Sequence, residues 1–274
     1  MLARKQQLLL LLIALCPGIY SEIIIDGLLD EEEWATARVV NQFYEVYPYS
    51  LETGHTDTKI LIKEDEKGMY FGFINNQPKD TIRLNQHQRD QGVRPPIGDQ
   101  NGVTIDFDND ARTGYRFIVN AGGSINDGVV INENEGNDDW DGEWKQASAI
   151  QDDGWTSEVL IPWSIAPMKS VSTEEREIGI CFYRLIISEF RVFATCEGSP
   201  YQEKFLSIFP KIKVWNGIFG KSKTVTFDRF FPAPQNGPKL SKSDQKTKDQ
   251  TVSYTHLRAH ETLRYLVCRL LLEK

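Results

Sequence analysis

The stretch 133–143 contains the residue types in this sequence that are best suited to binding chemistry. It holds six carboxylates and no Lys or Arg, and Trp140 and Trp144 lie in it or directly after it. Proteins commonly hold a sugar with a flat aromatic ring against its C–H-rich face, while carboxylates, amides or Arg hydrogen-bond the hydroxyl groups. Both types of group occur here, so we expect this stretch to bind a ligand. The candidate ligand-binding residues are Trp140, Trp144, Asp139 and Asp141, joined by Arg89 and Asp90 from an earlier loop.

Several of these residues also have an ordinary structural interpretation. Trp144 begins an expected strand and can simply fill the core, whereas Trp140, flanked by Asp and Gly, is harder to bury. Arg89 and Asp90 can form a solvated ion pair instead of contacting a hydroxyl group. Three other tryptophans are expected in the core: Trp34, Trp155 and Trp163.

A second acid-rich stretch, 106–110, has acids at alternate positions, like the first half of a calcium loop. Ala111 stands where an EF-hand needs its turn glycine and Phe117 where it needs its closing glutamate, which excludes that motif. Two acid-rich loops could still converge into a looser oxygen cage for calcium; the alternative is a solvated acidic rim. The expected metal ligands are Asp106, Asp108, Asp110 and Asp138.

An enzyme would need two positioned carboxylates, or a nucleophile with a base. Acids are so abundant here that a pair at glycosidase spacing would arise by chance. The sequence has no Gly-x-Ser-x-Gly, His-Glu-x-x-His or Gly-x-Gly-x-x-Gly motif. We therefore expect no catalysis. A haem site would have few axial ligands to draw on: Met69, Met168, His55 and His87.

The elements that must position these residues are short strands with turn signals between them. Residues 103–108 alternate strictly, with Thr104, Asp106 and Asp108 on a polar face, and 115–119 form the returning strand of a hairpin. Asp30 is expected to cap a short N-terminal helix. This pattern predicts an all-β fold, an antiparallel β-sandwich of about ten strands. The strands are expected at 39–47, 56–63, 69–75, 103–108, 115–119, 144–150, 155–161, 178–187, 190–196 and 205–215, with a long loop holding a short strand at 77–100.

Charge and leader composition limit the partners and the location. The net charge is −8, and the body of the chain carries no basic stripe, which argues against a nucleic-acid partner. Residues 1–21 resemble a signal peptide, because Arg4 and Lys5 precede a short apolar run. We expect export to the periplasm, the cell surface or the medium. Outside the leader and the tail, Cys181 and Cys196 remain on neighbouring expected strands, as a disulfide or as two buried thiols.

Four segments resemble, in the same order, the family-nine carbohydrate-binding modules and their DOMON-like relatives. They are Ile-Asp-Gly-Leu-Leu-Asp-Glu-Glu-Glu-Trp-Ala-Thr-Ala at 25–37, Val-Thr-Ile-Asp-Phe-Asp at 103–108, Gly-Tyr-Arg-Phe-Ile-Val-Asn at 114–120, and Gly-Trp-Thr-Ser-Glu-Val-Leu-Ile-Pro-Trp at 154–163. The likeness is greatest to the version at the N-terminus of large exported proteins that end in an outer-membrane barrel. It implies a β-sandwich over 22–231 that binds an oligo- or polysaccharide and sometimes calcium.

Two alternatives to sugar binding stay open. The domain could be a structural or partner-binding domain for an outer-membrane barrel missing from this chain, or a haem-binding DOMON-like electron carrier. Residues 232–250 are polar and rich in Pro and Lys, as in a linker. Residues 251–274 resemble translated sequencing-adapter read-through, which we expect not to be native; the alternative is an amphipathic helix.

Overall fold

The computed structural model describes residues 22–53, 56–91, 96–198 and 203–215. All of them belong to the first of two compact units, Met1–Ser222. The second unit, Lys223–Lys274, lies outside the described residues, as do the expected leader, linker and tail. Within the described ranges, no helix combines the length and the apolar character needed to cross a bilayer.

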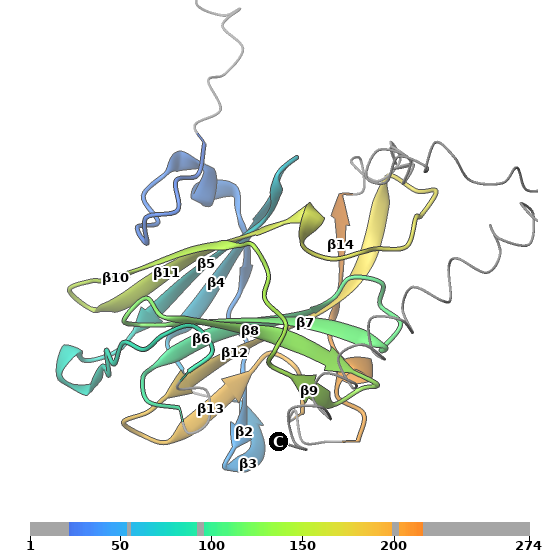
Figure 1. The fold of residues 1–274 in the computed structure, drawn as a ribbon. Coiled ribbons are helices and arrows are strands. Elements are labelled where there is room, and N and C mark those ends of the chain that lie inside the picture. The colour runs from blue at the N-terminus through green and yellow to red at the C-terminus, as the bar shows by residue number, and fades with distance from the viewer. Residues whose placement is uncertain (1–21, 54–55, 92–95, 199–202, 216–274) are drawn as a thin grey trace, which may run out of the picture. The chain divides into compact units, whose positions relative to one another are not determined.

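The described chain forms two antiparallel sheets that stack as layers (Figure 1). The small sheet has five strands in the order β1-β4-β5-β11-β10, and the large sheet has nine, in the order β3-β2-β13-β12-β6-β7-β8-β9 with β14 also paired to β12. The fold is therefore the antiparallel β-sandwich that the sequence predicted. The strands are β1 Arg38–Val40, β2 Tyr44–Tyr47, β3 Tyr49–Thr53, β4 Thr58–Glu64, β5 Gly68–Asn76, β6 Gln100–Asp106, β7 Thr113–Asn120, β8 Ile125–Ile131, β9 Glu135–Asn137, β10 Lys145–Ile150, β11 Gly154–Pro162, β12 Glu175–Ile186, β13 Arg191–Ala194 and β14 Lys211–Trp215.

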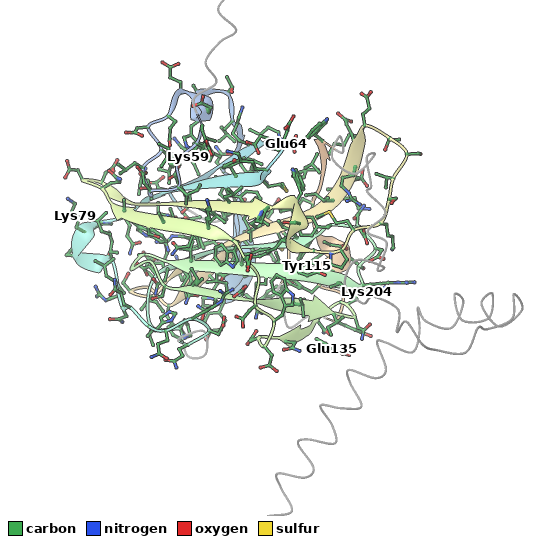
Figure 2. All side chains as sticks on the ribbon, turned by 45° about the horizontal axis from the view of Figure 1, so that its top comes forward. Lys59, Glu64, Lys79, Tyr115, Glu135 and Lys204 are labelled. Carbon is green, nitrogen blue, oxygen red and sulfur yellow. A yellow bond between two sulfur atoms is a disulfide. The ribbon has the colours of Figure 1, made fainter. Side chains whose placement is uncertain are left out.

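Side chains fill the space between the two sheets (Figure 2). This main core is rich in aromatic residues. Phe71 and Phe73 of the small sheet meet Phe182 of the large sheet edge to face, with ring centroids 5.3 and 6.0 Å apart. Strand alternation sends every second residue into this layer, because successive side chains point to opposite faces. Edge-to-face aromatic pairs add about 0.5–1.5 kcal/mol each beyond the burial of their area.

The predicted hairpins are present. The polar face predicted for residues 103–108, however, is not exposed to solvent. Strands β6 and β7 pair with Val103 opposite Phe117, yet Thr104 and Asp106 are as buried as Val103. A second apolar cluster that includes Phe205 packs on the outer face of the large sheet. Both faces of β6 are therefore covered. The buried Asp106 is satisfied locally, because its carboxylate accepts N–H groups of the following turn.

Several element boundaries differ from the sequence prediction. The expected strand 39–47 is divided into β1 and β2, and the expected strand 205–215 is a 3-10 helix, Leu206–Ile208, followed by β14. Strands β3, β8 and β9 were not predicted. In the described part of 77–100, a 3-10 helix, Lys79–Thr81, stands before β6 where a short strand was expected. A further 3-10 helix, Trp163–Ile165, follows β11.

The N-terminal segment packs on the small sheet through a buried carboxylate. Its helix is a 3-10 helix, Glu32–Thr36, that begins after Glu31 without a side-chain cap, so the predicted capping role of Asp30 is wrong. Trp34 is buried, as expected, and its indole Nε1–H donates to Glu158 of β11. The backbone N–H of Gly27 donates to the other oxygen of Glu158 at 2.9 Å. Gly27 has φ +92°, and a Cβ there would lie 2.8 Å from the Ser148 carbonyl carbon, so only glycine fits.

The large sheet is crosslinked on its outer face. Cys181 of β12 and Cys196, just after β13, form a disulfide with Cα atoms 5.5 Å apart. This resolves the choice between a disulfide and two buried thiols that the sequence left open.

Candidate functional site

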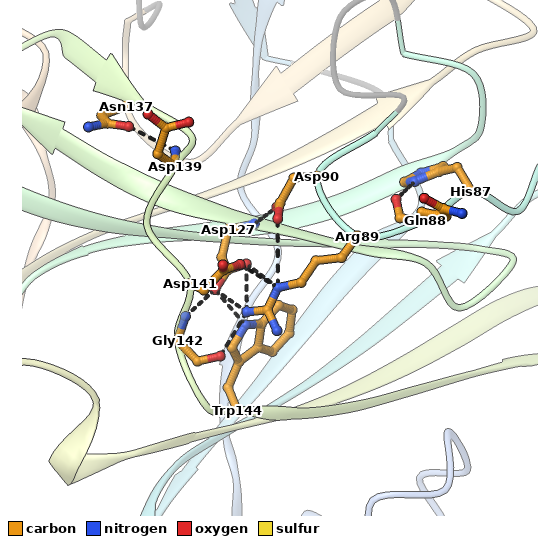
Figure 3. Close-up of polar contacts among 10 residues, drawn as sticks. All are labelled: His87, Gln88, Arg89, Asp90, Asp127, Asn137, Asp139, Asp141, Gly142 and Trp144. Atoms are coloured by element: carbon orange, nitrogen blue, oxygen red, sulfur yellow. Dashed lines mark hydrogen bonds and ion pairs between the residues drawn. The ribbon is translucent and has the colours of Figure 1, made fainter. Parts of the chain in front are cut away.

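A buried carboxylate, Asp127 of β8, organises the loops around the acidic stretch. Its side chain is 0% exposed. Arg89 donates to it through Nε at 3.0 Å and through Nη2 at 2.6 Å, which is a bidentate pairing. The backbone N–H of Gly142 donates to Oδ2 at 2.7 Å, and the indole Nε1–H of Trp144 at 3.2 Å. Such donors replace the hydrogen bonds to water that the Asp127 carboxylate loses on burial. We call this group the Asp127 cluster (Figure 3).

Arg89 joins two more acids to the cluster. Its Nε lies 2.9 Å from Asp141 and 3.7 Å from Asp90, and its Nη2 donates to the carbonyl of Gly142 at 2.8 Å. The hydrogen bond to Asp127 raises the pKa of Arg89 above its usual value. Partial burial raises the pKa of Asp90, and the neighbouring Arg89 opposes that rise. A single guanidinium therefore holds three carboxylates and the backbone of the acidic stretch together.

The structure brings together most of the residues that the sequence singled out for ligand binding. Arg89, Asp90, Asp141 and Trp144 all belong to the Asp127 cluster. Asp139 lies on the same loop, where its backbone N–H donates to the side chain of Asn137 and its side chain is exposed. The expected solvated pair of Arg89 with Asp90 is thus a minor contact beside the bidentate pair with Asp127.

Trp140 and Trp144 are both half-buried against the main core. The Trp144 ring meets Phe117 edge to face at 5.4 Å, and the Trp140 ring meets Tyr115 in the same way at 5.1 Å. A Cβ on Gly142 would lie 2.6 Å from the Trp140 ring, so glycine permits this packing. Trp140 is therefore less exposed than its Asp and Gly neighbours suggested, and only part of its surface can meet a ligand.

The expected calcium ligands of the stretch 106–110 face different partners. Asp106 is buried in its own turn, and burial raises its pKa. Asp108 accepts from the backbone N–H of Lys169 at 2.8 Å and from Arg176 at 3.2 Å. Asp110 forms an ion pair with the Lys169 ammonium, which lowers its pKa against the opposing effect of burial. Asp108 and Asp110 are thus paired with cationic side chains, whereas Asp106 accepts backbone N–H groups. Asp108 and Asp110 line a cavity of about 440 Å³.

The fourth expected ligand, Asp138, belongs to a polar group on the outer face of the large sheet. It pairs with Arg116 of β7. According to the strand pairing, Tyr183, Ile118 and Asn126 lie on the same face as Arg116, two residues further along β7 and its neighbouring strands. Within the described chain, both amide atoms of Asn126 are buried without a hydrogen-bond partner. Buried amides are nearly always satisfied, so this one has capacity for a further partner.

One acidic group has metal-binding spacing in the described part of the chain. Asp90, Asp127 and Asp141 offer oxygens within 4.8 Å of one another. The guanidinium of Arg89 contacts all three. Carboxylate oxygens suit calcium, so these residues could hold the ion if Arg89 moved away. This group shares no residue with the calcium ligands expected from the sequence.

Asp127 is the central residue that sequence reasoning missed. It stands in Asn126-Asp127-Gly128, a composition typical of turns, inside an unpredicted strand. The isoleucines and valines on either side of those three residues were the signal for a strand. Its partner Arg89 comes from 38 residues earlier, which no local pattern can indicate.

Comparison with known proteins identifies the fold. No family model matches the sequence. No curated protein matches it either. A family-nine carbohydrate-binding module from Caldicellulosiruptor kristjanssonii, solved with cellotriose, matches with a TM-score of 0.50 at 16% identity, over 80% of this chain and 97% of that one. A family-nine module from the same organism, solved with glucose, has a TM-score of 0.47 at 14% identity, over 71% and 92%. The chain described here has the fold of the family-nine carbohydrate-binding modules.

Proposed function

We propose that this chain is a non-catalytic carbohydrate-binding module of an exported or cell-surface protein, with an oligo- or polysaccharide as its ligand. The observation that carries the proposal is the Asp127 cluster, in which one guanidinium joins several carboxylates beside an indole. The fold is shared with modules solved in complex with sugars.

The exposed parts of the cluster have the chemistry that a sugar requires. Asp141 is 65% exposed along its side chain, and Arg89 is partly exposed. A carboxylate accepts hydrogen bonds from hydroxyl groups, and a guanidinium donates to ring and hydroxyl oxygens. Because Asp127 fixes Arg89 and the acidic loop before any ligand arrives, little ordering entropy is lost on binding.

Trp140 and Asp139 complete the proposed binding surface from the same loop. Trp140 can offer the exposed part of its ring to the C–H groups of a sugar while the rest of the ring stays packed on Tyr115. Asp139 is exposed and adds a further acceptor. Because Trp140 packs against the main core, its ring should need little rearrangement when a ligand binds.

A glycan array with the full chain, followed by calorimetry on the best ligand, tests the proposal. Trp140→Ala should weaken binding by about 1–3 kcal/mol, and Asp141→Asn should weaken it as well. Asp152→Asn is the matched control, because Asp152 is a fully exposed acid on the β10–β11 turn. Wild-type protein that binds no glycan on the array would refute the proposal. Equal losses in the Asp152 variant would show a general charge effect instead.

A further inference from the structure

Two large aromatic side chains are exposed and in contact at one end of the large sheet. Tyr47 ends β2, and Phe190 directly precedes β13. Their exposed fractions are 50% and 59%. Strands β2 and β13 are neighbours, and the rings of Tyr47 and Phe190 touch edge to face at 5.7 Å. We call these two residues the aromatic ledge.

Phe190 is held in a backbone conformation that a bulky residue seldom adopts. Its φ is +55°, in the left-handed region where glycine or asparagine is usual. The conformation costs free energy, and a largely exposed ring recovers little of that cost through burial. Folding alone would favour a small residue at this turn. The edge-to-face contact with Tyr47 offsets part of this cost.

Polar groups border the ledge and are held in fixed positions. Glu45 of β2 accepts from the hydroxyl of Ser50 at 2.8 Å and pairs with Nε of Arg191 at 2.9 Å. Arg191 also lies 3.9 Å from Glu189. The exposed donor Arg191 and the exposed acceptor Glu189 thus flank Phe190 in the chain, and the buried Glu45 holds Arg191 in place.

We propose that the aromatic ledge is a second carbohydrate-contact surface, separate from the Asp127 cluster, and that Phe190 and Tyr47 contact the C–H face of a sugar ring. The inference rests on the proposed function. The ligand would be a neutral polysaccharide whose hydroxyl groups reach the exposed side chains of Arg191 and Glu189.

Charge favours a neutral polysaccharide over an anionic membrane as the occupant. The border contains Glu45 and Glu189 against Arg191, and the whole chain has a net charge of −8. Membrane-surface proteins instead place Lys and Arg around their interfacial aromatics. The hydroxyl group of Tyr47 can donate to and accept from a polyol.

Affinity electrophoresis of the full chain in gels containing soluble mixed-linkage β-glucan, xylan or galactomannan tests the proposal. The variants are Tyr47→Ala and Phe190→Gly, with Tyr47→Phe as the conservative partner. Trp215→Ala is the matched control, because Trp215 is an exposed aromatic on a different strand, β14. Asp141→Asn probes the Asp127 cluster in parallel.

We expect Tyr47→Ala and Phe190→Gly each to weaken retention by the bound polysaccharide roughly three- to tenfold. Tyr47→Phe should stay within about twofold, because the ring is kept, and Trp215→Ala should match the wild type. Phe190→Gly should not lower the melting temperature, since glycine accepts the backbone conformation. A weakened retention in a variant of full stability separates a binding role from a structural one.

Other outcomes overturn the inference in distinguishable ways. If both ledge variants bind like the wild type while Asp141→Asn does not, the ledge is no sugar surface but the proposed function stands. If the wild type is retained by none of the polysaccharides and by no glycan on the array, both fall. Wild-type binding to vesicles of phosphatidylcholine and phosphatidylglycerol, or self-association in sedimentation, that is lost in Phe190→Gly would assign the ledge to a membrane or to a second copy instead.

Discussion

The indole of Trp34 donates a hydrogen bond to the carboxylate of Glu158 at 3.1 Å, and this contact joins the N-terminal segment to a strand 124 residues later. Burial raises the pKa of Glu158 to about 7, although Gly27 and Asp26 donate backbone hydrogen bonds that favour the charged form. The ionised carboxylate is therefore costly in the folded protein, and the N-terminal segment contributes the donors that offset part of this cost.

Glu158 should make the protein more stable in mild acid than at neutral pH. Its pKa is raised on folding, so the folded state binds more protons than the unfolded state between the ordinary Glu pKa and about 7. Stability from this group is fully present below the unfolded pKa and is lost as the pH rises through about 7. The loss is at most roughly 3 kcal/mol. Urea unfolding of wild type and Glu158→Gln at several pH values measures it. Equal pH dependence in the two proteins would contradict the assignment.

Removing the Asp127 carboxylate should destabilise the fold strongly. Asp127→Ala leaves the Arg89 guanidinium without its main partner and leaves the Gly142 N–H and the Trp144 indole N–H unpaired. We expect a loss of about 3 kcal/mol in the free energy of unfolding by urea titration. Asp152→Ala breaks a solvent-exposed pair with Lys79 and should leave the free energy of unfolding close to that of the wild type. Similar losses in both variants would mean that the Asp127 cluster is an ordinary surface network.

Calcium should stabilise the protein only when Arg89 is absent. In the wild type, the guanidinium of Arg89 already contacts Asp90, Asp127 and Asp141 and balances one of their charges. Arg89→Ala leaves these carboxylates close together, and a bound calcium ion could replace the lost charge. At free calcium about a hundredfold above its dissociation constant, the variant would gain roughly 2.7 kcal/mol. Melting curves in calcium and in chelator measure this gain. A calcium response in the wild type that Asp110→Asn removes would instead support the stretch 106–110 as the site.

The disulfide should contribute measurably to stability. Cys181 and Cys196 are separated by 15 residues, and closing a loop of this length in the unfolded chain is worth about 3 kcal/mol in the chain-entropy estimate. Replacing both cysteines by alanine should lower the free energy of unfolding by about that amount. Intact mass under non-reducing conditions checks that the bond is present in the starting protein. An unchanged free energy in the double variant would show that strain or residual structure cancels the gain.

The sequence could predict the sandwich and most hairpins because those features are local. The hairpin of β10 and β11 follows from alternation within a short window and a turn between the two strands. Strand β8 was missed because Asn126, Asp127 and Gly128 look like a turn when their neighbours are unknown.

Only part of the candidate site could be predicted, again because sequence patterns are local. Arg89 and Asp141 could be proposed from residue type, but their common partner Asp127 could not, since its burial depends on contacts from distant segments. The polar face of β6 was also misjudged, because Phe205 and its neighbours, which cover that face, come from the end of the domain. Residue chemistry is readable along the chain, whereas burial is a property of the assembled sheets.

The interleaved strand order also sets when this domain can fold during synthesis. Strand β5 obtains its second neighbour only from β11, and β6 obtains its second neighbour only from β12. Neither sheet can be completed until the later strands have left the ribosome, because two strands can pair only after both have been synthesised. The strands up to β10 therefore have no complete core until β11 and β12 have been synthesised. Stable folding of this domain is expected only after that point.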